Sequence, residues 1–228
     1  MFGWFTDFLN LFYPTVCAAC GERLATQEKV ICSRCLVDMP KTHFHHHQDN
    51  PVSQLFWGRA KVESATALFR FQKGSRFQEL LRLLKYKGRK DVGIELGRQL
   101  GFELKSSELF NKVEVVIPVP LHPKREKKRG YNQANCIAIG IAESMEIVVQ
   151  SKNLFRNTAT ETQTKKSRIE RWKNVDSIFS IHQASELENK HVLLVDDVVT
   201  TGATLEACAQ ALLKVSGIKV SIAALAMA

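Results

Sequence analysis

The sequence predicts an α/β fold: a mostly parallel sheet flanked by helices, preceded by a small N-terminal metal-binding ribbon. From about residue 62 onward, strand-like and helix-like patterns alternate along the chain, as they do in parallel sheets with helices on both faces. The run Val192–Val195 is apolar throughout, which is typical of a strand buried on both sides. Four of the six cysteines lie close together near the N-terminus.

The length of 228 residues suits one modest domain with a small module. Apolar residues make up 45% of the chain, enough for a packed core, which excludes wholesale disorder. We interpret the polar stretch Pro40–Pro51 as a linker, which divides the chain into residues 1–50, with a helix and the cysteines, and residues 51–228. Four histidines are assigned to this polar linker, with adventitious metal binding as the alternative: His43, His45, His46 and His47.

A short helix is expected before the cysteines. Phe5–Phe12 has apolar residues at helical spacing, and Pro14 ends it. A membrane-surface helix is the alternative, but Met1–Pro14 lacks the Lys and Arg that such helices carry. The same lack argues against a secretory signal, and no apolar run approaches the roughly 20 residues of a membrane span. We therefore expect a cytoplasmic protein.

The cysteines form two pairs of the Cys-x2-Cys type, Cys17 with Cys20 and Cys32 with Cys35, separated by 11 residues. Two such pairs form a closed tetrahedral site of four thiolates, the usual arrangement for structural Zn²⁺. Gly21 follows the first pair, where a turn is needed. Free thiols or a redox pair are the alternatives, but the thioredoxin-like βαβ pattern expected around a redox pair is missing.

The rest of the chain alternates strands and helices, assigned from apolar periodicity. The expected elements are a strand over Ala65–Phe71, a helix from Phe77 to near Gly88, an apolar run over Val113–Val119, a helix over Ala134–Met145, a strand over Val192–Val195, a helix opening near Ala203 and a strand over Val220–Leu225.

The segment with the most candidate binding residues begins where the buried strand ends. Asp196 and Asp197 come directly after it, at the sheet edge where α/β proteins bind ligands. The following loop is rich in hydroxyls and opens a helix, so its N–H groups can cradle a phosphate. The cradle residues are Thr200, Thr201, Gly202, Ala203 and Thr204. Two carboxylates beside such a cradle fit a ribose 5-phosphate, whose hydroxyls they bind; the alternative is that they merely end the sheet.

The net charge of +9 is concentrated in three runs, Lys85–Lys90, Lys124–Arg129 and Lys165–Lys173, each carrying +4. The remainder of the chain is therefore near −3. Any one run is explained equally well as a solvated loop. Three runs on a slightly acidic body indicate one cleft for an anionic ligand.

The acidic and hydroxyl-rich loop resembles the phosphoribosyl pyrophosphate (PRPP) loop of type I phosphoribosyltransferases. With the four cysteines, further motifs resemble the ComF family, the competence-associated proteins of bacterial DNA uptake, from about Pro14 to the C-terminus. These motifs are Leu84-Lys85-Tyr86-Lys87-Gly88, Ile117–His122, Arg129-Gly130-Tyr131-Asn132-Gln133-Ala134, and Arg156-Asn157-Thr158 with Gln163–Val175.

The resemblance implies a type I phosphoribosyltransferase-like domain over residues 51–228 that binds PRPP with Mg²⁺. Asp196 and Asp197 would hold the ribose hydroxyls, directly or through Mg²⁺, and Thr200–Thr204 the 5-phosphate. The diphosphate would be bound by the turn after Val119 together with Lys85, Lys87 and Arg129. Thr158–Trp172 would form a mobile hood, or only a flexible loop. Arg129–Gln133 is also explained as a turn with Asn132 as helix N-cap.

Three functions follow from these features. The first is a PRPP-binding protein of the competence machinery, acting on or near single-stranded DNA, with the competence helicase as a partner of the zinc ribbon. The second is a metabolic phosphoribosyltransferase acting on a nucleobase or other small acceptor, for which no base-specificity segment is recognised. The third is a scaffold with a vestigial site. The residues expected to contact DNA are Lys124, Arg125, Lys128, Tyr131, Arg168 and Arg171.

Overall fold

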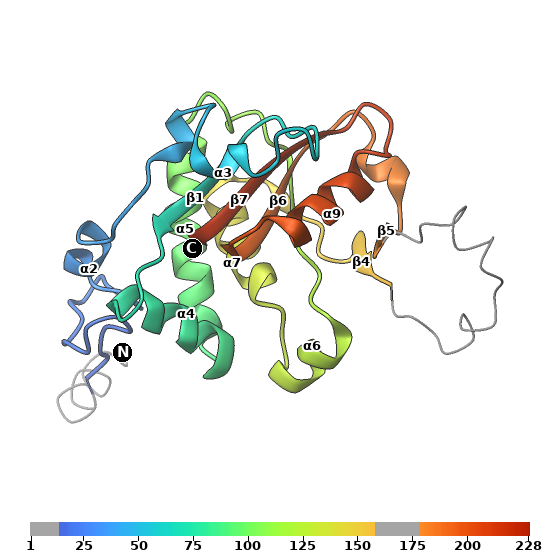
Figure 1. Ribbon diagram of the computed structural model, residues 1–228. Helices are drawn as coiled ribbons and strands as arrows, with labels where there is room; N and C mark the ends of the chain where they lie inside the picture. The colour runs from blue at the N-terminus through green and yellow to red at the C-terminus, as the bar shows by residue number, and fades with distance from the viewer. Residues whose placement is uncertain (1–13, 158–177) are drawn as a thin grey trace.

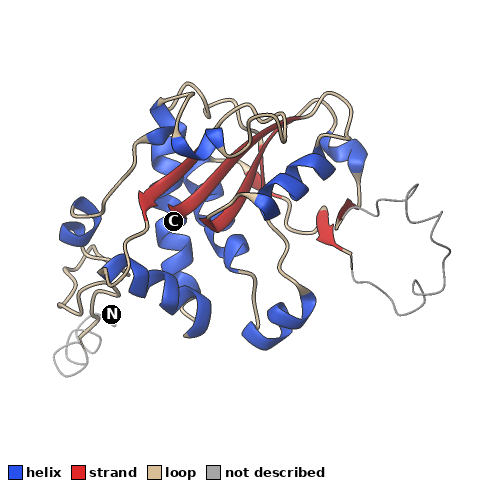
Figure 2. Ribbon diagram, in the orientation of Figure 1, coloured by secondary structure: helices blue, strands red, loops and turns tan. Residues whose placement is uncertain are grey.

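The computed structural model describes residues 14–157 and 178–228 (Figure 1). A five-stranded parallel sheet with the strand order β1-β7-β6-β2-β3 lies at its centre (Figure 2). Its strands are β1 Ala65–Arg70, β2 Val115–Pro118, β3 Val148–Val149, β6 His191–Val199 and β7 Lys219–Met227. A separate antiparallel pair is formed by β4 Leu154–Arg156 and β5 Phe179–Ile181. The predicted mostly parallel α/β architecture is confirmed.

Helices cover both faces of the sheet (Figure 1). The described helices are α2 Ser33–Val37, α3 Pro51–Gln54, α4 Arg76–Tyr86, α5 Lys90–Lys105, α6 Pro123–Arg129, α7 Gln133–Met145 and α9 Ala203–Leu212, with the 3₁₀ turns η1 Phe44–His46 and η3 Ala184–Leu187. Of these, α2 and α6 lie away from the sheet (Figure 1). Successive residues of β6 point to opposite faces. Leu193 and Val195 join the core beneath α4, α5 and α7, while Val192 and Leu194 join the core beneath α3 and α9. In the described part of the chain, no helix is long and apolar enough to cross a membrane.

Strand β6 is longer than its apolar run predicts. It continues through the two aspartates to Val199, because β7 runs beside it as far as the pairing of Val199 with Met227. On its other side β2 ends at Pro118, which pairs with Val195. Asp196 and Asp197 therefore lie beyond the end of β2, with a neighbouring strand on one side only. A cleft lined by both aspartates forms on this open side.

Helix α5 was not among the predicted elements. It contains three glycines at four-residue spacing, Gly93, Gly97 and Gly101, and glycine lowers helix propensity. Their role is close packing against α7. A Cβ on Gly97 would lie 2.3 Å from the carbonyl oxygen of Ile137, so only a glycine lets the two helix backbones touch there.

The stretch Pro40–Pro51 is not the free linker that its polarity predicts. The N–H of Thr42 donates to the carbonyl of Leu68, and the N–H of Arg70 donates to that of Pro40, both at 3.0 Å, so the segment runs against β1. His45 is buried, and this burial lowers the pKa of its imidazole to about 4. The domain boundary near residue 50 stays a prediction, and the helix expected over residues 5–12 lies outside the described residues.

Candidate functional site

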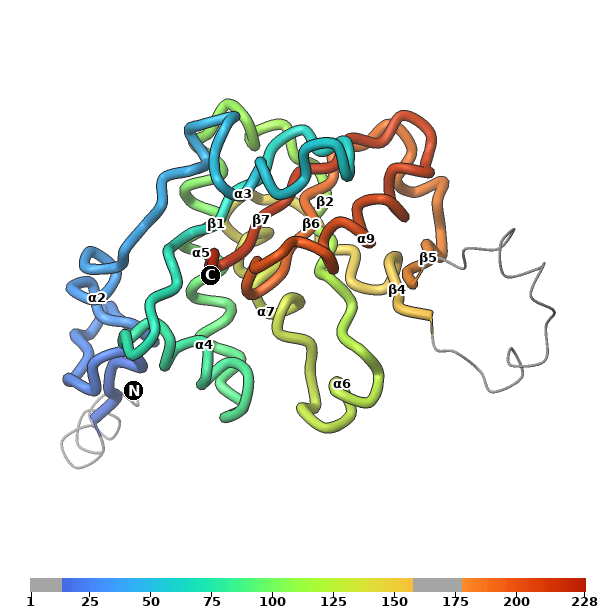
Figure 3. The backbone as a smooth tube through the Cα atoms, viewed as in Figure 1, coloured from blue at the N-terminus to red at the C-terminus, as the bar shows by residue number. Residues whose placement is uncertain are grey.

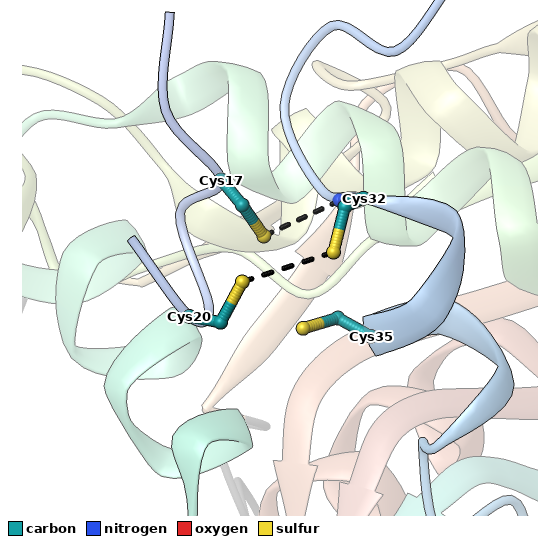
Figure 4. Close-up of side chains that lie close together, drawn as sticks. All are labelled: Cys17, Cys20, Cys32 and Cys35. Atoms are coloured by element: carbon teal, nitrogen blue, oxygen red, sulfur yellow. Dashed lines mark hydrogen bonds between the residues drawn. The ribbon is translucent and has the colours of Figure 1, made fainter. Parts of the chain in front are cut away.

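Four cysteine side chains point toward one another near the start of the described chain (Figure 4). The Sγ atoms of Cys17, Cys20, Cys32 and Cys35 all lie within 4.8 Å of one another, and those of Cys20 and Cys32 are 3.8 Å apart. Sulfurs bound tetrahedrally to Zn²⁺ at about 2.3 Å are themselves about 3.8 Å apart. The predicted cluster is present, and its donor set fits a structural metal ion.

Backbone donors surround one of these sulfurs. The Sγ of Cys17 accepts hydrogen bonds from the N–H groups of Cys32 at 3.3 Å and Ala19 at 3.4 Å. Burial alone raises the pKa of Cys17, but the backbone donors outweigh it and lower the pKa to about 7. Gly21 closes the turn with a φ of 77°, a conformation that favours glycine. The loop is thus shaped to hold a sulfur anion.

The cysteine module, residues 17–35, is packed onto the sheet domain. Ile31 belongs to the same apolar core as Phe69 and Phe77. The guanidinium of Arg76, the first residue of α4, lies 3.5 Å from the Sγ of Cys35. The other end of α4 carries Lys85, so one helix connects the cysteines to the cleft.

Asp196 and Asp197, the acid pair, line a cleft of about 180 Å³. The Lys85 Nζ lies 2.9 Å from the Oδ1 of Asp197, and the two side chains are only 24% and 14% exposed. The Oδ1 of Asp196 accepts the N–H of Asp197 at 2.8 Å. Lysine therefore neutralises one carboxylate, while the other has only a backbone donor.

This difference affects the acidity of Asp196. Burial, followed by the negative charge of Asp197, raises the pKa of Asp196 to about 7, although the backbone donor and Lys85 act in the opposite direction. A cation close to the acid pair would favour the ionised form of Asp196. The pair thus has negative charge that the surrounding residues do not fully compensate, and oxygen donors of this kind suit Mg²⁺.

The phosphate loop, Thr200–Thr204, lines an adjoining pocket of about 60 Å³ together with Asp196. Gly202 is the N-cap of α9 at a φ of 74° and makes no side-chain capping hydrogen bond. A Cβ on this residue would lie 3.2 Å from the ring of Phe56, so the tight turn excludes larger residues. Helix N–H groups and threonine hydroxyls together favour a bound phosphate.

A residue outside all the predicted motifs supports this loop. Arg59 donates to the carbonyl of Thr201 at 3.1 Å and forms an ion pair with Glu206 of α9. Its own carbonyl accepts from the amide of Gln210 at 3.1 Å. Arg59 thus joins the loop to α9, and nothing in its sequence surroundings indicates this role.

The opposite wall of the cleft is the turn after β2. Asn132 donates to the carbonyl of Val119 at 2.9 Å and accepts the N–H of Ala134 at 3.0 Å. It therefore caps α7 and fixes the turn at the same time. Arg129 donates to the Oε1 of Gln133, whose Nε2 is buried without a hydrogen-bond partner among the described residues.

The structure brings most of the predicted site residues together. The cleft is lined by Asp196, Asp197, Thr204, Lys85, Val119, Arg125 and Arg129, and the adjoining pocket also by Thr200, Thr201, Gly202 and Ala203. Lys87 is exposed at the end of α4 and does not line the cleft. Arg156 and His122 also line it, although no binding role was predicted for either. Strand β4, which carries Arg156, has three residues and is too short to show a pattern.

Residues 119–132 form a basic arm that leaves the body of the protein and carries α6 at its tip (Figure 3). This helix has no buried residue, so Lys124, Arg125 and Lys128 are exposed. Tyr131 is half-buried and its hydroxyl donates to the carbonyl of Leu84. Its ring is therefore partly packed against the body of the protein, so less of it is open for contact with DNA than the prediction for Tyr131 requires. Arg168 and Arg171 lie outside the described residues.

Comparisons with known proteins agree with this geometry. A family model described as the phosphoribosyl transferase domain matches residues 126–228. DNA utilization protein YhgH of Escherichia coli O157:H7 is 28% identical over 90% of this chain and 87% of that protein. Competence protein F of Haemophilus influenzae is 28% identical over 93% and 84%, and Competence protein ComFC of Bacillus subtilis is 28% identical over 87% and 78%.

The chain resembles the competence and DNA utilization proteins of the ComF family over most of its length. The resemblance seen in the sequence motifs is thereby confirmed. The acid pair and the phosphate loop fall within the matched phosphoribosyl transferase domain, whereas the cysteines and Lys85 precede it. The cleft is therefore completed by a helix from outside the matched domain.

Proposed function

We propose that this chain binds PRPP with Mg²⁺ and acts as a phosphoribosyltransferase-like protein of natural competence, on or near incoming single-stranded DNA in the cytoplasm. The acid pair carries this proposal, because it lies between the phosphate loop and a wall of basic residues. A ligand with vicinal hydroxyls between two phosphate groups matches that order of donors and acceptors. The names of the competence and DNA utilization relatives support the cellular role.

Each end of PRPP has its own partners in the proposal. Asp196 and Asp197 accept from the ribose hydroxyls, and the phosphate loop binds the 5-phosphate. Mg²⁺, held by the acid pair, supplies charge neutralisation for the diphosphate. Lys85, Arg129 and Arg156 line the cleft where the diphosphate would lie. No residue acts as a nucleophile, because departure of the diphosphate needs positioning and charge stabilisation alone.

Lys85 has a further part in ligand binding. Without a ligand it forms an ion pair with Asp197 at 2.9 Å. The acid pair would hold Mg²⁺, whose charge would compensate the two carboxylates. Lys85 would then be available to donate to the diphosphate.

Isothermal titration of the full chain with PRPP and Mg²⁺ tests the site. We expect the double variant Asp196→Ala and Asp197→Ala to weaken binding at least tenfold, because hydrogen bonds to charged groups contribute about 1.5–3 kcal/mol each. Glu108→Ala is the matched control, since it removes an exposed carboxylate outside the cleft. Equal affinity in the wild type and the double variant would refute the site.

The basic arm supports contact with DNA. Its charges lie beside the cleft, and the nearby Tyr86 ring is 70% exposed with the Arg129 guanidinium 5.4 Å from its centroid. An exposed aromatic ring beside cations is a typical platform for stacking a base of a single strand. We therefore place the DNA contacts on Lys124, Arg125, Lys128 and Tyr86.

Fluorescence anisotropy with a labelled oligonucleotide at several salt concentrations tests these contacts. Replacing Lys124, Arg125 and Lys128 by alanine should reduce the slope of log affinity against log salt by about 2, at roughly 0.7 per lost phosphate contact. Alanine at the exposed Lys112, Lys214 and Lys219 removes the same charge from near the amino-terminal ends of β2 and β7, away from the cleft, and should change the slope little. A similar reduction in both variants would contradict a specific DNA surface.

Cellular assays separate the competence role from nucleobase salvage. Deletion of the gene should abolish transformation, and the acid-pair double variant should fail to restore it. Pyrophosphate release with nucleobases and no transformation defect would favour the metabolic alternative.

Val16 and Val37, which flank the cysteine module in the sequence, are both exposed, and we propose that they belong to the docking site for the competence helicase. Val37→Asp should weaken capture of the purified helicase, and an unchanged yield would argue against that site.

A further inference from the structure

A second group of metal-binding side chains lies away from both the cysteines and the cleft. His43, His45 and Glu103 each offer one ligand atom, and these atoms all lie within 4.8 Å of one another. The two histidines belong to the segment packed on β1, and Glu103 belongs to the last turns of α5. This group contains two of the histidines that the sequence assigned to a linker.

One distance in this group matches a transition-metal site. The Nδ1 of His45 lies 3.3 Å from the Oε2 of Glu103. Ligands bound tetrahedrally to Zn²⁺ at about 2.0–2.1 Å are separated by about 3.3 Å. Two imidazoles and one carboxylate with an open fourth position form a common Zn²⁺ donor set.

One carboxylate oxygen of Glu103 is buried without a hydrogen bond in the described chain. Its Oε2 is buried and accepts no hydrogen bond within the described chain, despite its closeness to His45. The other oxygen, Oε1, pairs with the ammonium of Lys41 at 2.7 Å. Buried carboxylate oxygens are rarely left without a partner, and a bound ion can supply the partner that the protein does not.

Hydrogen bonds hold the backbone that carries the two histidines. The hydroxyl of Ser107 donates to the carbonyl of His45, and the N–H of Phe44 donates to the hydroxyl of Thr42 at 3.2 Å. His43 has a φ of 55°, so its backbone is in the left-handed region, and its side chain is exposed. The site therefore has one buried histidine, one exposed histidine and a nearly buried carboxylate.

We propose that His43, His45 and the Oε2 of Glu103 bind a divalent transition metal of the Zn²⁺ class, with solvent at the fourth position. The ion would fasten the segment beside β1 to the end of α5. Lys41 opposes binding, because its ammonium shares the same carboxylate. Its removal should therefore strengthen metal binding, an effect that a purely structural ion pair does not produce.

Cobalt titration of the full chain tests the proposal, after the cysteines have been loaded with Zn²⁺. We expect one Co²⁺ per chain to bind with ligand-field absorption and without a sulfur-to-cobalt charge-transfer band. His43→Asn should weaken this binding at least tenfold, since even outer-shell changes at metal sites cost about 10–100-fold. Asparagine tolerates the left-handed backbone, and His43 is exposed, so this variant should fold.

Two further variants complete the test. His47→Asn removes an exposed neighbouring histidine outside the group and should leave cobalt affinity unchanged. Lys41→Gln should raise the affinity several-fold. Three results would overturn the proposal: no cobalt bound beyond the zinc-loaded cysteines, equal losses in His43→Asn and His47→Asn, or weaker binding in Lys41→Gln.

Discussion

The cysteine module and the cleft are assembled in opposite ways. All four clustered cysteines come from one short segment, Cys17–Cys35, and three of them are buried. The cleft draws its residues from segments as far apart as Lys85 and Thr204, and its charged groups reach solvent. We conclude that changes in the module affect chiefly the stability of the fold, whereas changes in the cleft affect chiefly ligand binding.

The largest effect is expected at the cysteines. Cys35→Ser should sharply lower the free energy of unfolding, because structural Zn²⁺ contributes on the order of 10 kcal/mol to the folding of small zinc domains. PRPP affinity should fall as well, since Arg76 connects Cys35 to the helix that carries Lys85. Denaturant unfolding and zinc content measure the first effect, and calorimetry the second. Cys136→Ala, at a buried cysteine of α7, should keep its zinc; full zinc content in Cys35→Ser would contradict the proposed metal site.

The pH dependence of stability distinguishes the acid pair from the module. The pKa of Asp196 is raised to about 7 from its ordinary value of 3.8, so the native chain keeps a proton that the unfolded chain releases between these values. The free energy of unfolding should therefore fall as pH rises through this range, by about 1 kcal/mol per pH unit. Asp196→Asn should flatten the profile of the ligand-free protein, whereas Glu108→Gln should not. Identical profiles for Asp196→Asn and the wild type would show that Asp196 titrates normally.

Substitution of Lys85 tests ligand binding in the cleft separately from the stability of the fold. Lys85→Met should weaken PRPP binding by about 10- to 100-fold, the range of a charged hydrogen bond, with little change in the unfolding midpoint. Lys87→Met is the matched control, because Lys87 is exposed and lies outside the cleft. Calorimetry compares the two variants. Equal losses would mean that the cleft responds to the overall charge of α4 rather than to the contact with Asp197.

The smallest effect is expected at Asn132, whose side chain both caps α7 and holds the turn that lines the cleft. Asn132→Ala should lower the free energy of unfolding by about 1 kcal/mol, the usual contribution of an N-cap. Asn132→Ser should restore the cap but not the hydrogen bond to Val119, so stability should return while PRPP affinity stays reduced two- to threefold. Thermal unfolding and calorimetry measure these effects. Recovery of both properties in the serine variant would show that the turn needs only the cap.

Several predictions depended on local chemistry and are confirmed. The spacing of the cysteines is enough to form their cluster, because each pair lies within a single turn of chain. The apolar run Val192–Val195 indicated a buried strand because burial on both faces leaves no polar positions. Helix α5 was missed because its glycines reduce helix propensity, and their purpose is visible only when α7 is packed against them.

Other features depend on contacts between distant segments, which no local pattern specifies. Arg59 supports the phosphate loop from a position 142 residues earlier in the chain. Tyr131 and Tyr86 are both aromatic residues within basic motifs, yet packing buries much of the first and exposes the second.

Periodicity and spacing along the chain were enough to predict the parallel α/β class and the cysteine cluster, and the motifs were enough to find the resemblance to the ComF family. Three features became visible only in the folded structure: the cations that line the cleft, the pairing of Lys85 with Asp197, and the approach of His43 and His45 to Glu103. These contacts join residues far apart in sequence. They depend on how α4 packs beside β6 and on how the end of α5 lies beside the segment that runs along β1.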